Sequence, residues 1–165
     1  MVQSGHKSHA VAGLQFMKPP HVLIVEARFY AHINDFLVAG AEEVLAEAGA
    51  TFEKVVVPGA LEIPAAVSFA AQRTTDRPFD AFVALGCVIR GATSHYETVC
   101  SESARGLSDL ALAANLPIGN GILTVENEDQ AVERADKTRL NKGGGAAEAA
   151  LIMLHLKQTF GLWPL

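Results

Sequence analysis

The segment from Gly86 to Glu97 (GCVIRGATSHYE) joins a glycine-containing turn to the expected start of a helix. Ser94 and Glu97 have the spacing of a capping box, so we expect the helix to begin at Ser94. A helix start presents free backbone N–H groups and the positive end of the helix dipole, which together attract an anion. His95 lies in this first turn, and histidine readily exchanges a proton near neutral pH. The combination indicates chemistry on a small phosphorylated molecule.

The same residue types also have purely structural explanations. A histidine in a helix is more often structural or solvated than catalytic, and only its place beside an anion-binding turn makes His95 a candidate. Cys87 follows an expected buried strand with no basic partner evident nearby, which favours a packed thiol over a nucleophile. Arg134, within Glu-Arg-Ala-Asp, fits a solvated helix face. Phe29 fits either the core or a platform on which a flat ring stacks.

Two glycine-rich segments resemble nucleotide-binding loops only weakly. Gly119-Asn120-Gly121 begins like a dinucleotide fingerprint but lies inside an expected strand, and Lys142 to Gly145 lacks the order of a P-loop. We interpret Gly143 to Gly145 as a close backbone approach at a helix start, with Lys142 adding a positive charge. The histidines do not stand at metal-ligand spacing from other ligand types, so we expect no metal site.

The composition is that of a folded domain. Of 165 residues, 50% are hydrophobic and 19% are charged, which argues against disorder. A net charge of −5 without a basic stripe excludes nucleic acid as an expected partner, and no apolar run is long enough to span a membrane. Because no export signal is recognisable, we expect a cytoplasmic protein with reduced cysteines. We expect a flexible arm over residues 1–20 and one domain over residues 21–165.

Strands and helices are expected to alternate along this domain. The strands are rich in Val, Ile and Phe and nearly continuously apolar, which is typical of strands buried on both faces; they are His21 to Glu26, Phe52 to Val57, Phe79 to Leu85 and Ile118 to Thr124. The helices, with Gly49 and Gly161 as stop signals, are Asn34 to Ala48, Pro64 to Arg73, Ser94 to Asn115, a short one capped by Asn127 and Gln130, and Gly145 to Phe160. This alternation predicts a three-layer α/β/α fold with a four-stranded parallel sheet.

Ligands of such sheets bind beyond the carboxyl ends of the strands. The segments at these ends are Ala27 to Tyr30, Pro58 to Glu62, the turn from Gly86 to His95, and Val125-Glu126. The first three carry aromatic, acidic and histidine residues where a structural loop would need only turn formers. We therefore expect them to converge on a single site.

Several of these segments together resemble lumazine synthase, an enzyme family of riboflavin biosynthesis. The matching pieces run in the family's order from about Val22 to Phe160; they are Ala27-Arg28-Phe29, Pro58-Gly59-Ala60-Leu61-Glu62-Ile63-Pro64, Ala84 to Tyr96, Gly121-Ile122-Leu123-Thr124, Glu133-Arg134-Ala135 and Asn141-Lys142-Gly143. The resemblance implies a flavodoxin-like sheet assembled into homopentamers. It also implies the condensation of 5-amino-6-ribitylaminouracil with 3,4-dihydroxy-2-butanone 4-phosphate, without cofactor or metal, and suggests riboflavin synthase as a partner.

The resemblance further assigns roles to individual residues. Phe29 would stack on the pyrimidine, while Ala60, Leu61 and Glu62 would line the ribityl pocket. Cys87, Val88 and Ile89 would hold the ring edge through backbone groups. Ala92 and Thr93 would seat the phosphate, and His95 would move protons. Arg134, on the phosphate, and Lys142 would come from the neighbouring subunit, which replaces the solvated-face interpretation of Arg134.

Three positions depart from the common family pattern. Tyr30 stands where many members have Asn, and Asn120 stands where many have a Phe that faces the neighbour's ligand. The segment from Asp136 to Leu140 lacks the glycines of members that form icosahedral shells, which predicts assembly that stops at the pentamer. The first two departures leave open a non-catalytic lumazine or flavin binder, or an assembly scaffold.

Overall fold

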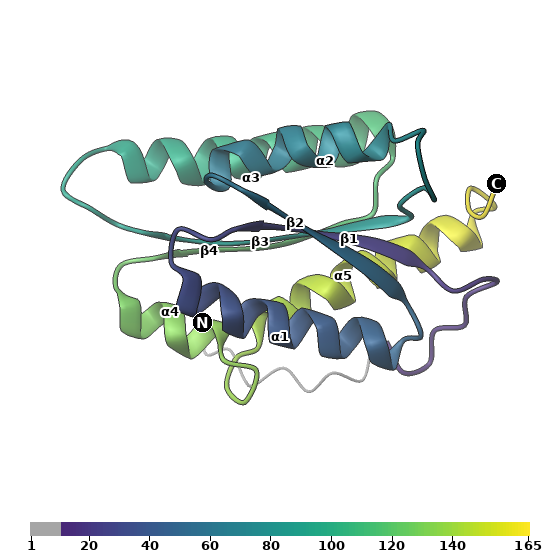
Figure 1. Cartoon of the computed structure of the whole chain (residues 1–165), viewed down its shortest axis with the longest axis horizontal. Helices are drawn as coiled ribbons and strands as arrows, with labels where there is room; N and C mark the ends of the chain where they lie inside the picture. Colours follow the sequence, from purple (N-terminus) through teal and green to yellow (C-terminus); the bar gives the residue numbers. More distant parts are fainter. Residues whose placement is uncertain (1–10) are drawn as a thin grey trace.

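The computed structural model describes residues 11–165, which form a four-stranded, all-parallel sheet with the strand order β2-β1-β3-β4 (Figure 1). The strands are β1 (His21–Ala27), β2 (Thr51–Val57), β3 (Ala81–Ile89) and β4 (Ile118–Val125). The helices are α1 (Ala31–Glu47), the short 3-10 helix η1 (Ala60–Glu62), α2 (Ile63–Ala71), α3 (His95–Ala114), α4 (Glu128–Ala135) and α5 (Lys142–Thr159). The expected three-layer α/β/α, flavodoxin-like fold is confirmed.

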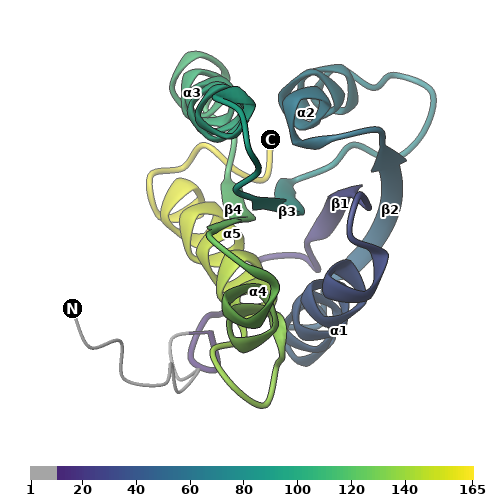
Figure 2. The ribbon, with the colours of Figure 1, turned by 90° about the vertical axis from the view of Figure 1, so that its left-hand side faces the viewer.

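Helices cover both faces of the sheet. Figure 2 shows α2 and α3 on one face and α1, α4 and α5 on the other. Successive residues of β1 point to opposite faces, so Val22 and Ile24 join the core under α1 and α5, while Leu23 and Val25 join the core under α2 and α3. A sheet with a buried core on each side requires strands that are apolar throughout, as β1 and β3 are.

The edge strand β2 departs from this pattern. Its apolar sequence predicted burial on both faces, but Val55 and Val56 are 41% and 62% exposed. The expectation was wrong for β2 because this strand lies at the edge of the sheet, where it pairs with β1 and with no other described strand. An apolar, unpaired edge is a surface that another chain can cover.

Local signals set most of the helix boundaries. Gly49 and Gly161 adopt positive φ angles of 72° and 74° just after α1 and α5, where only glycine is unstrained. Asn127 caps α4, because its side chain accepts the Gln130 N–H at 2.9 Å. The expected third strand ended too early. In the structure β3 extends four residues beyond Leu85, to Ile89, because each of these four residues pairs with a residue of β4.

The expected arm lies only partly within the described residues. Residues 1–10 fall outside them. Residues 11–20 lie against the end of the chain: Val11 is buried in the core, and Phe16 meets the rings of His155 and Trp163 edge to face. Gln158 accepts the Met17 N–H at 2.8 Å. This part of the arm is therefore held against α5 and the residues that follow it.

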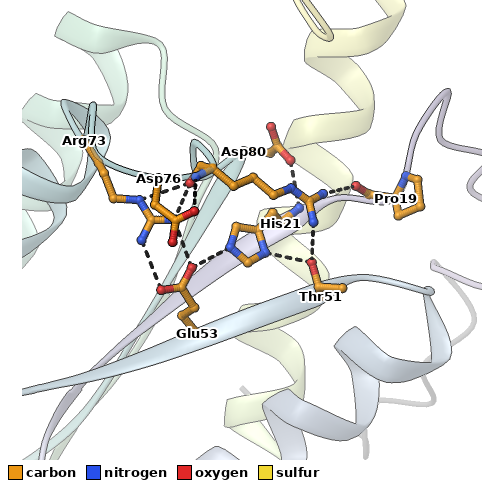
Figure 3. A network of polar contacts seen from close by, with 8 residues as sticks. Pro19, His21, Thr51, Glu53, Arg73, Asp76 and Asp80 are labelled. Carbon is orange, nitrogen blue, oxygen red and sulfur yellow. Dashed lines mark hydrogen bonds and ion pairs between the residues drawn. The ribbon is translucent and has the colours of Figure 1, made fainter.

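A network of polar side chains joins the amino ends of β1 and β2 (Figure 3). The His21 ring lies between Thr51 Oγ1 at 2.7 Å and Glu53 Oε2 at 2.6 Å. Arg73, just after α2, donates to both oxygens of Glu53 at 3.0 and 2.9 Å. Arg77 donates to Thr51 at 3.0 Å. The network fastens the edge strand to its neighbour and to the segment that follows α2.

This network predicts acid-sensitive stability. The Arg73 and His21 hydrogen bonds lower the pKa of Glu53 from 4.5 to about 2. A lowered folded-state pKa stabilises the fold above about pH 4.5, and this contribution is lost as the pH falls through about 2. We expect Glu53→Gln to lower the free energy of unfolding by about 1 kcal/mol near neutral pH, because solvent screens this 42% exposed carboxylate.

The penalty should shrink towards about pH 3, as measured by urea unfolding. Glu47→Gln, at an exposed carboxylate that makes no ion pair or side-chain hydrogen bond with the described residues, should show no such trend. A Glu53→Gln penalty that stays constant with pH would contradict the role of the ion pair.

Candidate active site

A hollow of about 420 Å³ opens at the carboxyl ends of β1, β2 and β3, beside the start of α3. Its volume lies in the range of small-molecule sites. Nine of the residues predicted for the site line it: Phe29, Ala60, Leu61, Glu62, Cys87, Val88, Ile89, Thr93 and His95. Tyr30 lines it as well. The structure thus brings the three chemistry-bearing loops to one place.

Phe29 projects from the loop that follows β1. Its ring is 76% exposed and meets Tyr30 edge to face at 5.0 Å. Arg28 anchors this loop by donating to Glu26 at 2.7 Å and to Asp35 at 2.5 Å. An exposed aromatic ring on an anchored loop is a suitable platform for a flat, conjugated ligand.

The strand β3 supplies the floor of the hollow. Cys87 is 6% exposed, and burial raises the pKa of its thiol to about 12. The thiol therefore stays protonated at neutral pH, which agrees with the packed-thiol interpretation and argues against a nucleophile. Val88 and Ile89 are half-buried beside it at the end of β3.

The capping box predicted at the start of α3 is wrong. Ser94 is the N-cap residue, but its side chain makes no capping hydrogen bond, and the Glu97 carboxylate pairs with Arg90 instead. Within the described chain, the N–H groups of residues 91–94 have no hydrogen-bond acceptor. A run of free N–H groups at the start of a helix of 20 residues can receive an anion.

Two predicted residues lie in this turn. Thr93 Oγ1 accepts the His95 N–H at 3.3 Å, and Ala92 is exposed beside it without lining the hollow. The His95 side chain is exposed and makes no hydrogen bond to the described residues. An unpaired imidazole beside a turn of free N–H groups is placed where it could exchange protons with a ligand in the hollow.

The three remaining predicted residues line a second hollow, between β4, α4 and α5. Asn120 accepts the Ile122 N–H at 3.0 Å through its own side chain. Arg134 donates to the Gln130 carbonyl at 3.1 Å, and the Lys142 side chain makes no hydrogen bond or ion pair with residues 11–165. The two hollows share no lining residue. One chain therefore presents two separate groups of candidate residues.

Several residues at the site were not anticipated from the sequence. Tyr96 and Val99 line the first hollow from α3, one and four residues beyond the predicted His95. Arg90 and Glu126 meet at 2.8 Å. Each follows directly on the paired strand ends Ile89 and Val125, so their adjacency depends on a register that sequence patterns do not define.

These features define a class of protein: a parallel α/β protein with a hollow of small-molecule size at the carboxyl edge of its sheet, beside a turn of free N–H groups. No helix among residues 11–165 is long and apolar enough to cross a membrane.

Comparison with known proteins identifies the family. A sequence model described as 6,7-dimethyl-8-ribityllumazine synthase matches residues 19–158. A protein of that name from Sphingopyxis alaskensis is 61% identical over 142 residues, covering 86% of this chain and 98% of the relative. One from Bartonella tribocorum is 57% identical over 147 residues, covering 89% and 96% respectively. The chain belongs to the 6,7-dimethyl-8-ribityllumazine synthase family.

The position of Lys142 depends on a close crossing of α1 and α5. Gly143 lies so near α1 that a Cβ there would be 2.0 Å from the Leu37 carbonyl oxygen, whereas a Cβ at Gly145 would meet nothing within 4 Å. The close backbone approach expected of the run from Gly143 to Gly145 is therefore confirmed at Gly143 and wrong at Gly145. It also sets the start of α5, and with it Lys142, at the rim of the second hollow.

This contrast provides a matched pair of variants. Gly143→Ala should destabilise the protein by about 3 kcal/mol, because the new methyl group must push two helix backbones apart. Gly145→Ala should be neutral or stabilise by up to about 1 kcal/mol, since alanine favours the helix. Urea unfolding of both variants measures the difference, and equal effects would contradict the crossing.

Proposed function

We propose that the chain condenses 5-amino-6-(D-ribitylamino)uracil with 3,4-dihydroxy-2-butanone 4-phosphate to give 6,7-dimethyl-8-ribityllumazine, phosphate and water, in riboflavin biosynthesis. The observation that carries the proposal is the single hollow in which an exposed aromatic ring, a free imidazole and a turn of unpaired N–H groups meet. Membership of the family supports the same reaction.

The pyrimidine and its ribityl chain occupy the part of the hollow nearest β1 and η1. Phe29 stacks on the ring, and the backbone of Cys87, Val88 and Ile89 holds its edge. Glu62, exposed at the end of η1, accepts hydrogen bonds from ribityl hydroxyls beside Ala60 and Leu61. These roles are supported by the fact that all of these residues line the same hollow.

The butanone phosphate binds at the start of α3, where Ala92 and Thr93 lie among the free N–H groups. Arg134 of a neighbouring subunit neutralises the phosphate, and that subunit's Lys142 and Asn120 face the pyrimidine side. The two arginines nearest the hollow are already committed, since Arg28 and Arg90 each pair with two carboxylates. The cation must therefore come from elsewhere, and Arg134 is a good candidate.

The reaction begins with attack of the pyrimidine amine on the butanone carbonyl to form an imine. Phosphate then leaves by elimination, and the ring closes with loss of water. His95 moves protons in these steps, which is typically worth about 10²–10⁴-fold. Holding the two substrates together contributes more, because oriented reactants reach effective molarities of about 10⁵ M or above. The anion-binding turn stabilises the departing phosphate.

The enzyme acts as a homopentamer in the cytoplasm and does not assemble further, since Asp136 to Leu140 contains no glycine. Support for assembly comes from the apolar surface left open on one chain, which includes Val56 on the edge strand and Phe69 at 75% exposure on α2. Assembly would cover this surface and bring the second hollow of one subunit to the first hollow of the next. The family resemblance also suggests riboflavin synthase, which would use the product, as a partner.

Two departures from the family pattern modify this picture. Tyr30 lines the hollow beside Phe29, so its ring replaces an amide there. Asn120 offers its NH₂ group to the neighbour's ligand, since its oxygen is already bonded to Ile122. A non-catalytic binder or scaffold gains no support from any observation on this chain.

Lumazine fluorescence after mixing the two substrates tests the activity, and Arg134→Ala tests the assignment of the phosphate. Loss of a charge-assisted contact of about 2 kcal/mol should raise the KM for the butanone phosphate roughly thirtyfold while changing the KM for the pyrimidine little. Arg139→Ala, on the exposed turn that follows α4, is the matched control. Equal rises in both KM values would contradict a phosphate contact.

A further inference from the structure

Arg90 links three elements at the rim of the site. Its Nε donates to Glu126 Oε2 at 2.8 Å, beyond β4, and its Nη1 donates to Glu97 in the first turn of α3. Its guanidinium lies 4.2 Å from the centre of the Tyr96 ring, which lines the hollow. The backbone N–H of Arg90 also donates to the Val125 carbonyl at 2.9 Å. The side chain is thus fixed in one place by contacts on several sides.

The charges of this cluster do not favour an anion. One guanidinium lies between two carboxylates, so the cluster of Arg90, Glu97 and Glu126 carries one positive and two negative charges. The pKa of Glu97 is lowered chiefly by its hydrogen bond to Arg90, so this carboxylate is ionised at neutral pH. A cluster with excess negative charge is a poor ligand for a phosphate. We therefore ask how the cluster affects the site through the position in which Arg90 holds the Glu97 carboxylate.

The sequence of α3 offers Glu97 a second position. Ser94 and Glu97 have capping-box spacing, in which the carboxylate accepts the N–H of the N-cap residue. In the structure this N–H has no acceptor within the described chain, because Glu97 is held by Arg90. If Glu97 returned to the capping position, its negative charge would lie in the turn formed by residues 91–94. It would then repel the phosphate and occupy one of its donors.

We propose that Arg90 is a positioning residue that keeps Glu97 out of the helix cap and so leaves the start of α3 open for the substrate phosphate. The inference rests on the proposed function, since it takes the turn of residues 91–94 as the phosphate site. It accounts for a capping box that the sequence contains and the structure does not form. It also explains why an arginine beside an anion site is paired entirely with acidic residues.

A pair of substitutions tests this role. Arg90→Ala should raise the KM for the butanone phosphate roughly tenfold, as expected for an uncompensated carboxylate beside a partly solvated phosphate, and leave the KM for the pyrimidine within about twofold. Arg90→Ala/Glu97→Ala should bring the KM for the butanone phosphate back to within about threefold of the wild type, because alanine neither repels the phosphate nor accepts the Ser94 N–H. Binding of inorganic phosphate is measured by the shift in melting temperature that it causes. This shift should be lost in Arg90→Ala and recovered in the double variant.

Arg105→Ala is the matched control, because Arg105 also holds two carboxylates on α3, Glu102 at 2.6 Å and Asp109 at 2.7 Å, away from the turn. It should change neither KM. If the double variant binds phosphate as weakly as Arg90→Ala, Arg90 contacts the phosphate directly or only supports the fold, and the inference is overturned. If the wild type makes no lumazine from the two substrates, the proposed function fails, while the phosphate titrations still decide the role of Arg90.

Discussion

The parallel pairing of β3 with β1 and with β4 is the constraint on which the site depends. The ladder with β1 sets Val25 opposite Ala84, so the loops after both strands open into the same hollow. The ladder with β4 runs to Ile89 opposite Val125, which makes Arg90 and Glu126 neighbours. Without this register, the aromatic ring after β1 would not share a hollow with the imidazole and the turn of free N–H groups after β3.

The same register separates the second group of residues from the first. Asn120 pairs with Ala84, four positions before the Val88–Thr124 pair, which corresponds to about 13 Å along a strand. It therefore lies well back from the strand ends, in the hollow that also holds Arg134 and Lys142. A head-to-tail ring can join the two hollows, because each subunit then presents one surface to each neighbour. The exposed edge strand and Phe69 are consistent with surfaces buried in such a ring.

Patterns along the chain were sufficient to predict the elements and the convergence of their loops. Apolar runs defined β1 and β3, and Gly49 and Gly161 marked helix ends through their positive φ angles. These signals act within a few residues, so sequence carries them well. The roles that the family resemblance gives to individual residues, such as Phe29 and Arg134, stay predictions until ligands or variants test them.

What the sequence could not supply were interactions whose outcome depends on distant partners. Glu97 has two competing partners, the Ser94 N–H and Arg90, and in the structure it pairs with Arg90, which Glu126 beyond β4 also holds. The prediction that β2 is buried on both faces failed for a similar reason, because the composition of this strand does not reveal that it lies at an edge of the sheet. Electrostatic competition and position in the sheet thus limit prediction more than local propensity does.

The central claim is that each active site is completed by a neighbouring subunit, and mixed assemblies of two inactive variants measure this directly. Subunits carrying His95→Ala and subunits carrying Arg134→Ala are dissociated, mixed in equal amounts and reassembled. If the two residues act across a subunit junction, random assembly gives about one quarter of sites both wild-type side chains, and activity should rise well above the mean of the two variants. Activity that stays at that mean, in assemblies of normal size, would contradict the shared site.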